Sequence, residues 1–326
     1  MEYRKLISFG KNSFVVSLPK SWIRQNKLVK GDLIYIDDNG SNLTLSKKES
    51  TQEPLEKTKI IHTDKKSIHL IKREVNSAYV LNYRTIILKG DNLRSNIKQL
   101  QEVFQNLIAL EIMEQGPDTL IAKDFLNMDK ASVVELIKKM DIIARAMFKE
   151  ACSNFTNENY ENINERDLDV NRLYHLLYRS VLYNLDNPLK SLKNFKLNAI
   201  DLVNHLFSGY FIEGVADEVR RTMRYACLTK MSPKEEKILA GMMMRLYSYY
   251  LDSMKAIYNR DISLALQQFD LKKKFNEELE VMKQRNRKVE NYNVVISRMR
   301  KLISFIHSLG RLVYQGYNYY DDMPEI

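Results

Sequence analysis

Two long runs of the sequence, residues 158–185 and 198–230, carry apolar residues at every third or fourth position. This spacing predicts two amphipathic helices. The connection between them is short and contains Asn187 and Pro188, so we expect the helices to pack side by side as an antiparallel hairpin. Such a chain must fold around a helical core, and any charged residue on a packed face then needs a partner.

Four polar residues lie on those packed faces. At about 100° per residue, Asp167 and Asn171 share one face with the apolar residues of the first helix, and Glu213 and Asp217 do so on the second. In an antiparallel hairpin, residues at equal height have numbers with a constant sum. Asp167 with Asp217 and Asn171 with Glu213 have the same sum, so the two pairs are predicted to meet at one level of the core.

Three acids and an amide at one level of a core require a cation, a buried base or a water-filled groove. Their oxygen atoms suit hard or first-row divalent ions such as Mn²⁺, Fe²⁺, Zn²⁺ or Mg²⁺. We therefore predict a divalent metal site at these four residues. Two alternatives stay open: the acids are solvated or paired with arginines, or the helices pack in a register shifted by a few residues.

The composition is that of an ordinary globular protein with ample core, because 44% of the 326 residues are hydrophobic and 28% are charged. The length suggests two or three domains. No stretch approaches 18 uninterrupted apolar residues, and the first residues, MEYRKLISFGKN, contain no apolar signal region. We therefore expect a cytoplasmic protein without membrane insertion. The two cysteines and five histidines show no metal-ligand spacing, which argues against a disulfide framework or a structural zinc site.

Residues 3–48 predict a small strand-rich unit with a basic surface. We expect strands at 3–9, 14–18, 33–37 and 43–46, and one helical turn at 20–25. The chain carries a net charge of +10, and residues 1–48 hold nine Lys and Arg against four Asp and Glu, so about half of the excess lies here. This charge permits nucleic acid, anionic membrane or phosphate partners. Four short strands enclose too little core to be stable alone, so the unit should dimerise.

The run RKLISFGKNSFVVSLPKSWIRQNKLVKGDLIYI resembles the SpoVT/AbrB swapped-hairpin DNA-binding domain, in which two chains interleave their hairpins. The matching features are the paired basic residues of the first strand, the Gly10-Lys11 turn, the proline that ends the second strand, the short helix and the Gly31-Asp32 turn. The resemblance implies a homodimer that binds DNA through Arg4, Lys5, Lys11, Asn12, Lys20 and Arg24. An alternative is that the fold serves only dimerisation or protein docking, as in toxin-neutralising relatives.

The middle of the chain predicts a linker at 49–64 and a small α/β module at 65–125. Within the module we expect strands at 67–71, 85–89, 109–114 and 119–123, and helices at 74–83 and 93–107. The module contains no glycine-rich phosphate loop and no pair of acids. Its expected role is packing or ligand sensing.

Residues 127–326 predict six long helices, which divide into two sets of three. The expected ranges are 129–154, 158–185, 198–230, 233–259, 262–286 and 291–319. The runs ERDLDVNRLYHLLYRSV and FIEGVADEVRR resemble the E(D)xxxD motifs of the PhoU family of phosphate-uptake regulators, in a form seen in archaeal relatives. The resemblance implies two tandem three-helix bundles that bind metal through these motifs. Asn171 stands where the family has an acid, and the second set lacks the motif, so the resemblance implies one reduced site.

The sequence therefore predicts a multidomain, mainly α protein with a swapped-hairpin β domain, a small α/β module and a PhoU-like helical body. By resemblance it is a DNA-binding transcriptional regulator linked to phosphate uptake or phosphate signalling. The alternative is a protein-interaction adaptor that acts on a phosphate transporter or signalling partner and uses its N-terminal domain only to dimerise. A metal-dependent hydrolase is disfavoured because the sequence indicates no general base, nucleophile or substrate pocket beside the acids.

Overall fold

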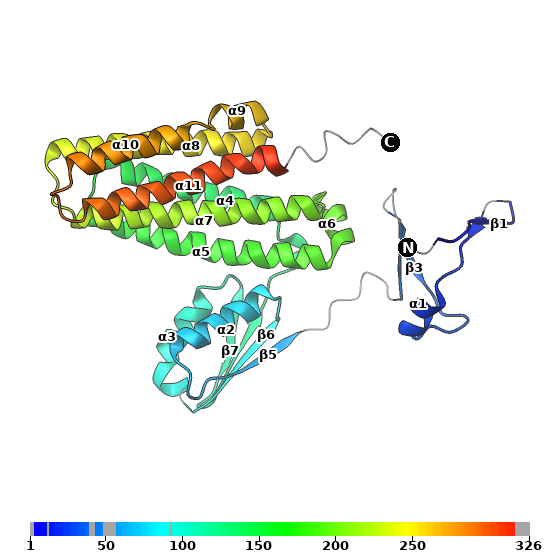
Figure 1. The fold of residues 1–326 in the computed structure, drawn as a ribbon. Helices are drawn as coiled ribbons and strands as arrows, with labels where there is room; N and C mark the ends of the chain where they lie inside the picture. Colours follow the sequence, from blue (N-terminus) through cyan, green and yellow to red (C-terminus); the bar gives the residue numbers. More distant parts are fainter. Residues whose placement is uncertain (1–2, 12, 39–42, 48–56, 92, 317–326) are drawn as a thin grey trace. The chain divides into compact units, whose positions relative to one another are not determined.

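The computed structural model describes residues 3–11, 13–38, 43–47, 57–91 and 93–316, and it divides into two units, Met1–Glu56 and Lys57–Ile326 (Figure 1). The N-terminal unit contains two antiparallel hairpins separated by one short helix. The hairpins pair β1 (Ile7–Phe9) with β2 (Ser13–Val15) and β3 (Tyr35–Asp38) with β4 (Leu43–Ser46), and the helix is α1 (Lys20–Gln25). The predicted order of elements is confirmed, although β1 and β2 are shorter than expected. The Asn39-Gly40 turn lies outside the described residues.

The second unit begins with a four-stranded α/β module. Its elements are β5 (Thr58–His62), α2 (Ile68–Val80), β6 (Thr85–Lys89), α3 (Leu93–Gln105), β7 (Leu110–Gln115) and β8 (Thr119–Asp124). The strands lie in the order β5-β6-β8-β7, with β5 parallel to β6 and the other neighbours antiparallel. Figure 1 shows α2 and α3 on one face of this sheet. Buried residues of α2, α3 and the strands form a core of their own beneath the two helices.

Two predictions in this module are wrong. The predicted linker 49–64 contains a strand, β5, whose Ile61 is buried in the module core. The predicted strand 67–71 is instead the start of α2, because the Ser67 side chain accepts a hydrogen bond from the Leu70 backbone N–H and so caps the helix. Helical spacing then places Ile71, Val75 and Tyr79 on one buried face.

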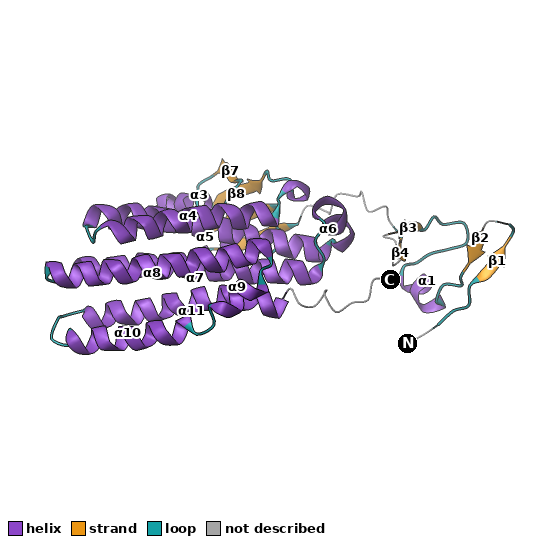
Figure 2. Cartoon of the chain, turned by 90° about the horizontal axis from the view of Figure 1, so that it is seen from above, coloured by secondary structure: helices purple, strands orange, loops and turns teal. Residues whose placement is uncertain are grey.

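The remaining helices form one body (Figure 2). They are α4 (Val133–Ser153), α5 (Asn157–Asp186), α6 (Pro188–Phe195), α7 (Ala199–Leu228), α8 (Pro233–Asn259), α9 (Ile262–Gln267), α10 (Leu271–Arg285) and α11 (Tyr292–Gly316), after a short 3-10 turn at Met128–Lys130. The predicted α8 is confirmed, and its capping box joins Ser232 and Glu235. The prediction of one continuous helix at 262–286 is wrong, because this stretch forms two helices, α9 and α10. The break between them lies beside Gln268, whose buried side chain accepts a hydrogen bond from Ser253. The predicted connection at Asn187-Pro188 also contains an extra helix, α6.

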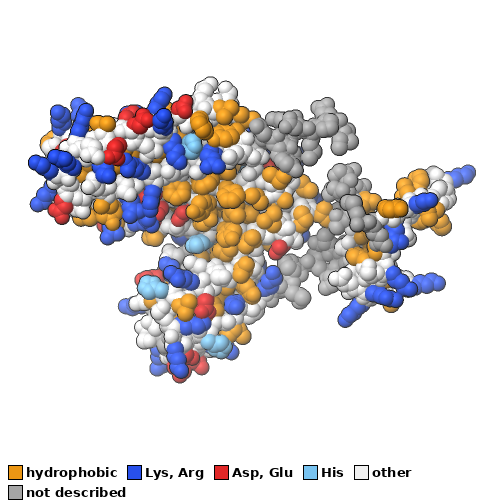
Figure 3. Space-filling view, in the orientation of Figure 1, with side chains coloured by type: hydrophobic (Ala, Val, Ile, Leu, Met, Phe, Trp, Pro, Cys, Tyr) orange, Lys and Arg blue, Asp and Glu red, His pale blue; other side chains and the backbone are white. Residues whose placement is uncertain are grey.

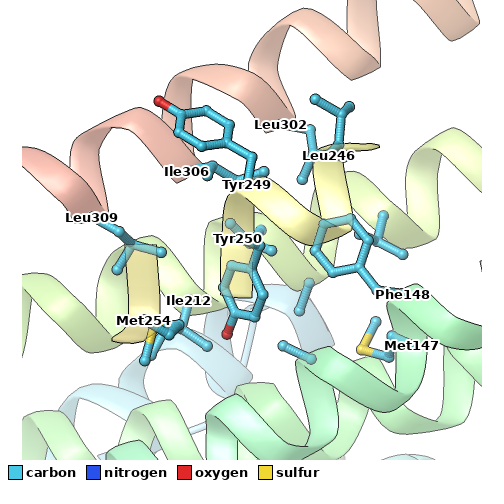
Figure 4. Packing of buried hydrophobic residues seen from close by; sticks show 14 of the residues in the cluster. Met147, Phe148, Ile212, Leu246, Tyr249, Tyr250, Met254, Leu302, Ile306 and Leu309 are labelled. Atoms are coloured by element: carbon cyan, nitrogen blue, oxygen red, sulfur yellow. The ribbon is translucent and has the colours of Figure 1, made fainter. Parts of the chain in front are cut away.

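The long helices share one hydrophobic core. Helices α4, α5 and α7 pack against one another, and α11 packs against α7, α8 and α10. Figure 4 shows part of this core, with Phe148, Ile212, Tyr250 and Leu302 contributed by four different helices. Among the described residues, no helix is both long and apolar enough to cross a membrane.

Candidate functional site

The structure brings the four predicted polar residues of the helical body together across α5 and α7, with an arginine between them. Arg220 Nε lies 3.0 Å from Asp167 Oδ2 on α5, and Arg220 Nη2 donates a hydrogen bond of 2.7 Å to Asp217 Oδ1 on α7. Asn171 Nδ2 donates to Asp167 Oδ2 at 3.2 Å. Arg220 therefore connects the two helices at the level where their acids meet.

Further arginines hold the neighbouring acids on α7. Arg221 forms an ion pair of 2.9 Å with Asp217. The Glu218 carboxylate is almost completely buried and lies 3.7 Å from Arg221 and 3.6 Å from Arg298 of α11. Burial raises the pKa of Glu218 above its ordinary value, and Arg298 and Arg221 oppose this shift. The cluster is thus a network of alternating carboxylates and guanidinium groups.

Glu213 differs from its neighbours because, within the described part of the chain, its carboxylate forms no hydrogen bond and no ion pair. It faces a cavity of about 440 Å³ between α7 and α11, lined by Tyr210, Glu213, Gly214, Asp217, Glu218, Arg221, Lys301, Ser304 and Phe305. Burial, and then the negative charges of Asp217 and Asp167, raise the pKa of Glu213 to about 7. This carboxyl group therefore keeps its proton to a higher pH than an exposed glutamate does.

A divalent metal does not fit the cluster as it stands. The Arg220 guanidinium already occupies the space between Asp167 and Asp217, and Asn171 directs its N–H₂ group toward Asp167. Among the described residues there is no group of three or more His, Cys, Asp or Glu arranged to hold a metal ion. The observed pairing agrees with the alternative in which arginines neutralise the acids, and the metal stays a prediction.

A second buried ion pair, which the sequence did not indicate, joins the α/β module to the helical body. Arg179 of α5 is fully buried and places Nη2 2.5 Å from Asp124 Oδ2 at the end of β8. Its Nε donates to Asn82 Oδ1 at 3.0 Å, and its guanidinium lies 4.6 Å from the centre of the Tyr79 ring. Asp124 is also paired with Arg84. The only sequence feature that could have revealed this site is an arginine inside the apolar run LLYRSVLY.

The predicted DNA contacts of the N-terminal unit lie on its surface. Lys20 and Arg24 are exposed and lie four residues apart on α1, and therefore on one side of that helix. Lys11 follows Gly10, whose φ of +73° makes the turn between β1 and β2. Lys5 and Arg4 are exposed just before β1, whereas Asn12 lies outside the described residues.

The same unit leaves most of its apolar side chains uncovered (Figure 3). Leu28 is the only apolar residue that is buried among its described residues. Tyr3, Leu6, Ile7, Phe9, Phe14, Val15, Val16, Val29, Leu33, Tyr35, Ile36 and Leu43 are all exposed. Two isolated hairpins with no core are not stable in water, so this surface needs to be covered.

One known family model matches this unit. Residues 7–53 match the family model for antidote-toxin recognition MazE, bacterial antitoxin. The match supports the SpoVT/AbrB-like domain predicted from the motif. It fits a DNA-binding or antitoxin-type regulatory role, and domains of this type bind DNA and dimerise.

The match covers the N-terminal unit and does not extend into the α/β module or the helical body. No curated protein and no solved structure matches the chain significantly. The helical body is consistent with a PhoU-like arrangement only in being a bundle of long helices.

Proposed function

We propose that this protein is a DNA-binding transcriptional regulator that acts as a homodimer through its N-terminal unit. The observation that carries the proposal is the combination, within one unit of the MazE type, of exposed cations and an uncovered apolar surface. A second copy would cover the apolar side chains. Each Val, Leu, Ile or Phe covered in this way contributes about 1.5–3 kcal/mol.

Dimerisation would also double the set of cations. Lys5, Lys11, Lys20 and Arg24 of each copy would then face the same duplex. Lys and Arg side chains bind phosphates first, which gives affinity without sequence preference, and contacts to base edges give specificity. The helical body then provides a place where a signal or partner protein changes the activity of the DNA-binding unit.

Removal of the exposed cations should weaken DNA binding at all sequences. For the triple variant Lys11→Ala, Lys20→Ala and Arg24→Ala, we expect the slope of log K against log salt to fall by about one for each phosphate that is no longer neutralised. The measurement is fluorescence anisotropy on duplexes of genomic and random sequence over a range of salt concentrations.

The matched control for this experiment is Lys139→Ala, which removes an exposed cation from α4 of the helical body and should leave the slope unchanged. Absence of DNA binding by the unmodified chain at low salt would contradict the proposal. That result would favour the adaptor, whose N-terminal unit only dimerises.

The apolar surface allows a separate test of the dimer. Phe14 is 66% exposed in a single copy, so Phe14→Lys places a charge in the surface that the second copy would cover and buries no charge within its own copy. We expect the variant to be monomeric by light scattering and to lose DNA binding although it gains positive charge. Ile142→Lys is the matched control, because Ile142 is 65% exposed on α4 and lies outside this unit. A Phe14→Lys variant that remains dimeric would place the dimer contact elsewhere.

We further propose that the helical body is PhoU-like and links the regulator to phosphate uptake or phosphate signalling, through a transporter or a signalling protein. The runs ERDLDVNRLYHLLYRSV and FIEGVADEVRR support this, because they form the facing segments of α5 and α7. Genome-wide mapping of the protein on DNA under phosphate excess and phosphate starvation tests the link. Occupancy that is identical in the two conditions would argue against a phosphate signal.

A further inference from the structure

We propose that Arg220 takes the place of a divalent cation in the acid cluster between α5 and α7. The guanidinium group of this chain would then supply the positive charge that a bound metal ion supplies in a metal site. The resemblance to metal-binding motifs implies an ion at this level. The contacts of Asp167 and Asp217 instead show that arginine side chains already neutralise the two carboxylates.

The positive charge needed by the acids is supplied within the cluster. Arg220 contacts Asp167 and Asp217, and Arg221 forms a second ion pair with Asp217. The two carboxylates therefore face two guanidinium groups, which stay charged at all relevant pH values. A divalent ion would have to enter against two fixed positive charges and displace contacts of 2.7–3.0 Å.

The geometry of Arg220 is suited to this role. Its side chain is 19% exposed, and the carboxylate of Asp167 is 9% exposed, so the contact is largely shielded from water. The guanidinium uses one nitrogen for α5 and another for α7 and so bridges two helices, as a bound metal ion does. Asn171 contributes a donor rather than an acceptor, with Nδ2 2.9 Å from the Asp167 carbonyl oxygen.

The consequence is that the helical body keeps its α5–α7 contact whatever the supply of metal. As they stand, the acids are not arranged to hold a metal ion. Removal of the two arginines should allow Asp167, Glu213 and Asp217 to close around one, because both guanidinium groups that neutralise Asp167 and Asp217 would then be absent. Oxygen ligands of this kind bind Mn²⁺. The acids would repel one another until an ion entered, so metal binding and folding would become coupled.

The experiment compares the unmodified chain, Arg221→Met, and the double variant Arg220→Met with Arg221→Met, each titrated with MnCl₂. Bound Mn²⁺ is measured by loss of its free-ion EPR signal, and stability by thermal melting followed by far-UV circular dichroism. We expect the unmodified chain and Arg221→Met to bind no Mn²⁺ at this cluster and to melt at the same temperature with EDTA or MnCl₂. We expect the double variant to melt lower in EDTA and to recover roughly 5–10 °C at a Mn²⁺ concentration a hundred times its dissociation constant.

Asp167→Asn added to the double variant should abolish the Mn²⁺ response, which assigns the ion to this cluster. Stoichiometric Mn²⁺ binding by the unmodified chain that is lost on Asp167→Asn would overturn the proposal. A folded double variant that takes up no Mn²⁺ would also overturn it. If the double variant does not fold in EDTA, its refolding with MnCl₂ remains the expected result, and failure to refold counts against the proposal.

Discussion

Asp124→Asn is expected to lower the free energy of unfolding of the second unit by about 3–5 kcal/mol. The substitution keeps the shape of the side chain but removes the negative charge that faces Arg179. Both side chains of this pair are fully buried, so the guanidinium would be left as an uncompensated charge in the interior. Arg84, the other partner of Asp124, is one-third exposed and can turn toward water. Its charge would therefore not be left unpaired in the interior. Urea denaturation followed at 222 nm measures the loss.

Glu278→Gln is the matched control, because it neutralises one member of an exposed ion pair. Arg245 and Glu278 are 53% and 41% exposed, so the expected change is within about 0.5 kcal/mol. Arg179→Met in the Asp124→Asn background should restore part of the stability, since the unpaired buried charge is then absent. A decrease below about 1 kcal/mol for Asp124→Asn would show that the pair does not hold the module against the helical body.

Local sequence patterns predicted the elements whose boundaries depend on residues close in the chain. The helix α8 begins at Pro233 because Ser232 and Glu235 form a capping box, and all of these residues stand within one turn. The strand β5 was missed because it follows a polar segment and has one buried residue, Ile61. Its pairing partner is β6, more than twenty residues away, so its identity depends on a contact that periodicity does not encode.

The acid cluster was partly predictable for a related reason. The spacing of Asp167, Asn171, Glu213 and Asp217 on two consecutive helices follows from helix geometry, and the structure places them at one level. Arg220 lies only three residues after Asp217, but its second contact is with Asp167 on α5. Which way a long side chain turns is decided by tertiary packing, so the residue that supplies the charge could not be identified from spacing.

The Arg179 site was not predictable, because its partners are brought together only by the tertiary fold. Asp124 and Asn82 belong to a different layer of the fold, and neither stands in a pattern with Arg179 along the sequence. The helix that carries the predicted DNA contacts Lys20 and Arg24 is the opposite case. Its motif is continuous in the chain, and α1 has the bounds that were expected.

Glu213→Gln is expected to raise the free energy of unfolding at pH 8 and to change it much less at pH 5. Burial and the charges of Asp217 and Asp167 raise the pKa of Glu213 from 4.5 to about 7 in the folded chain. The folded state therefore binds this proton more tightly than the unfolded state. The stability contributed by the proton is fully present below pH 4.5 and is lost as the pH rises through 7.

At pH 8 the folded protein must hold an ionised Glu213 beside two other carboxylates, and the shift from 4.5 to about 7 corresponds to up to about 3 kcal/mol. Glutamine has the same shape and no charge, so Glu213→Gln should gain most of that amount at pH 8 and flatten the dependence of stability on pH between 5 and 8.

Glu278→Gln is again a useful control. The hydrogen bond from Arg245 holds the pKa of Glu278 below its ordinary value, so removing that carboxylate should lower stability above pH 4.5, the opposite sign. An unchanged pH dependence in Glu213→Gln would mean that Arg220 and Arg221 neutralise all three acids, with Glu213 ionised in the folded state.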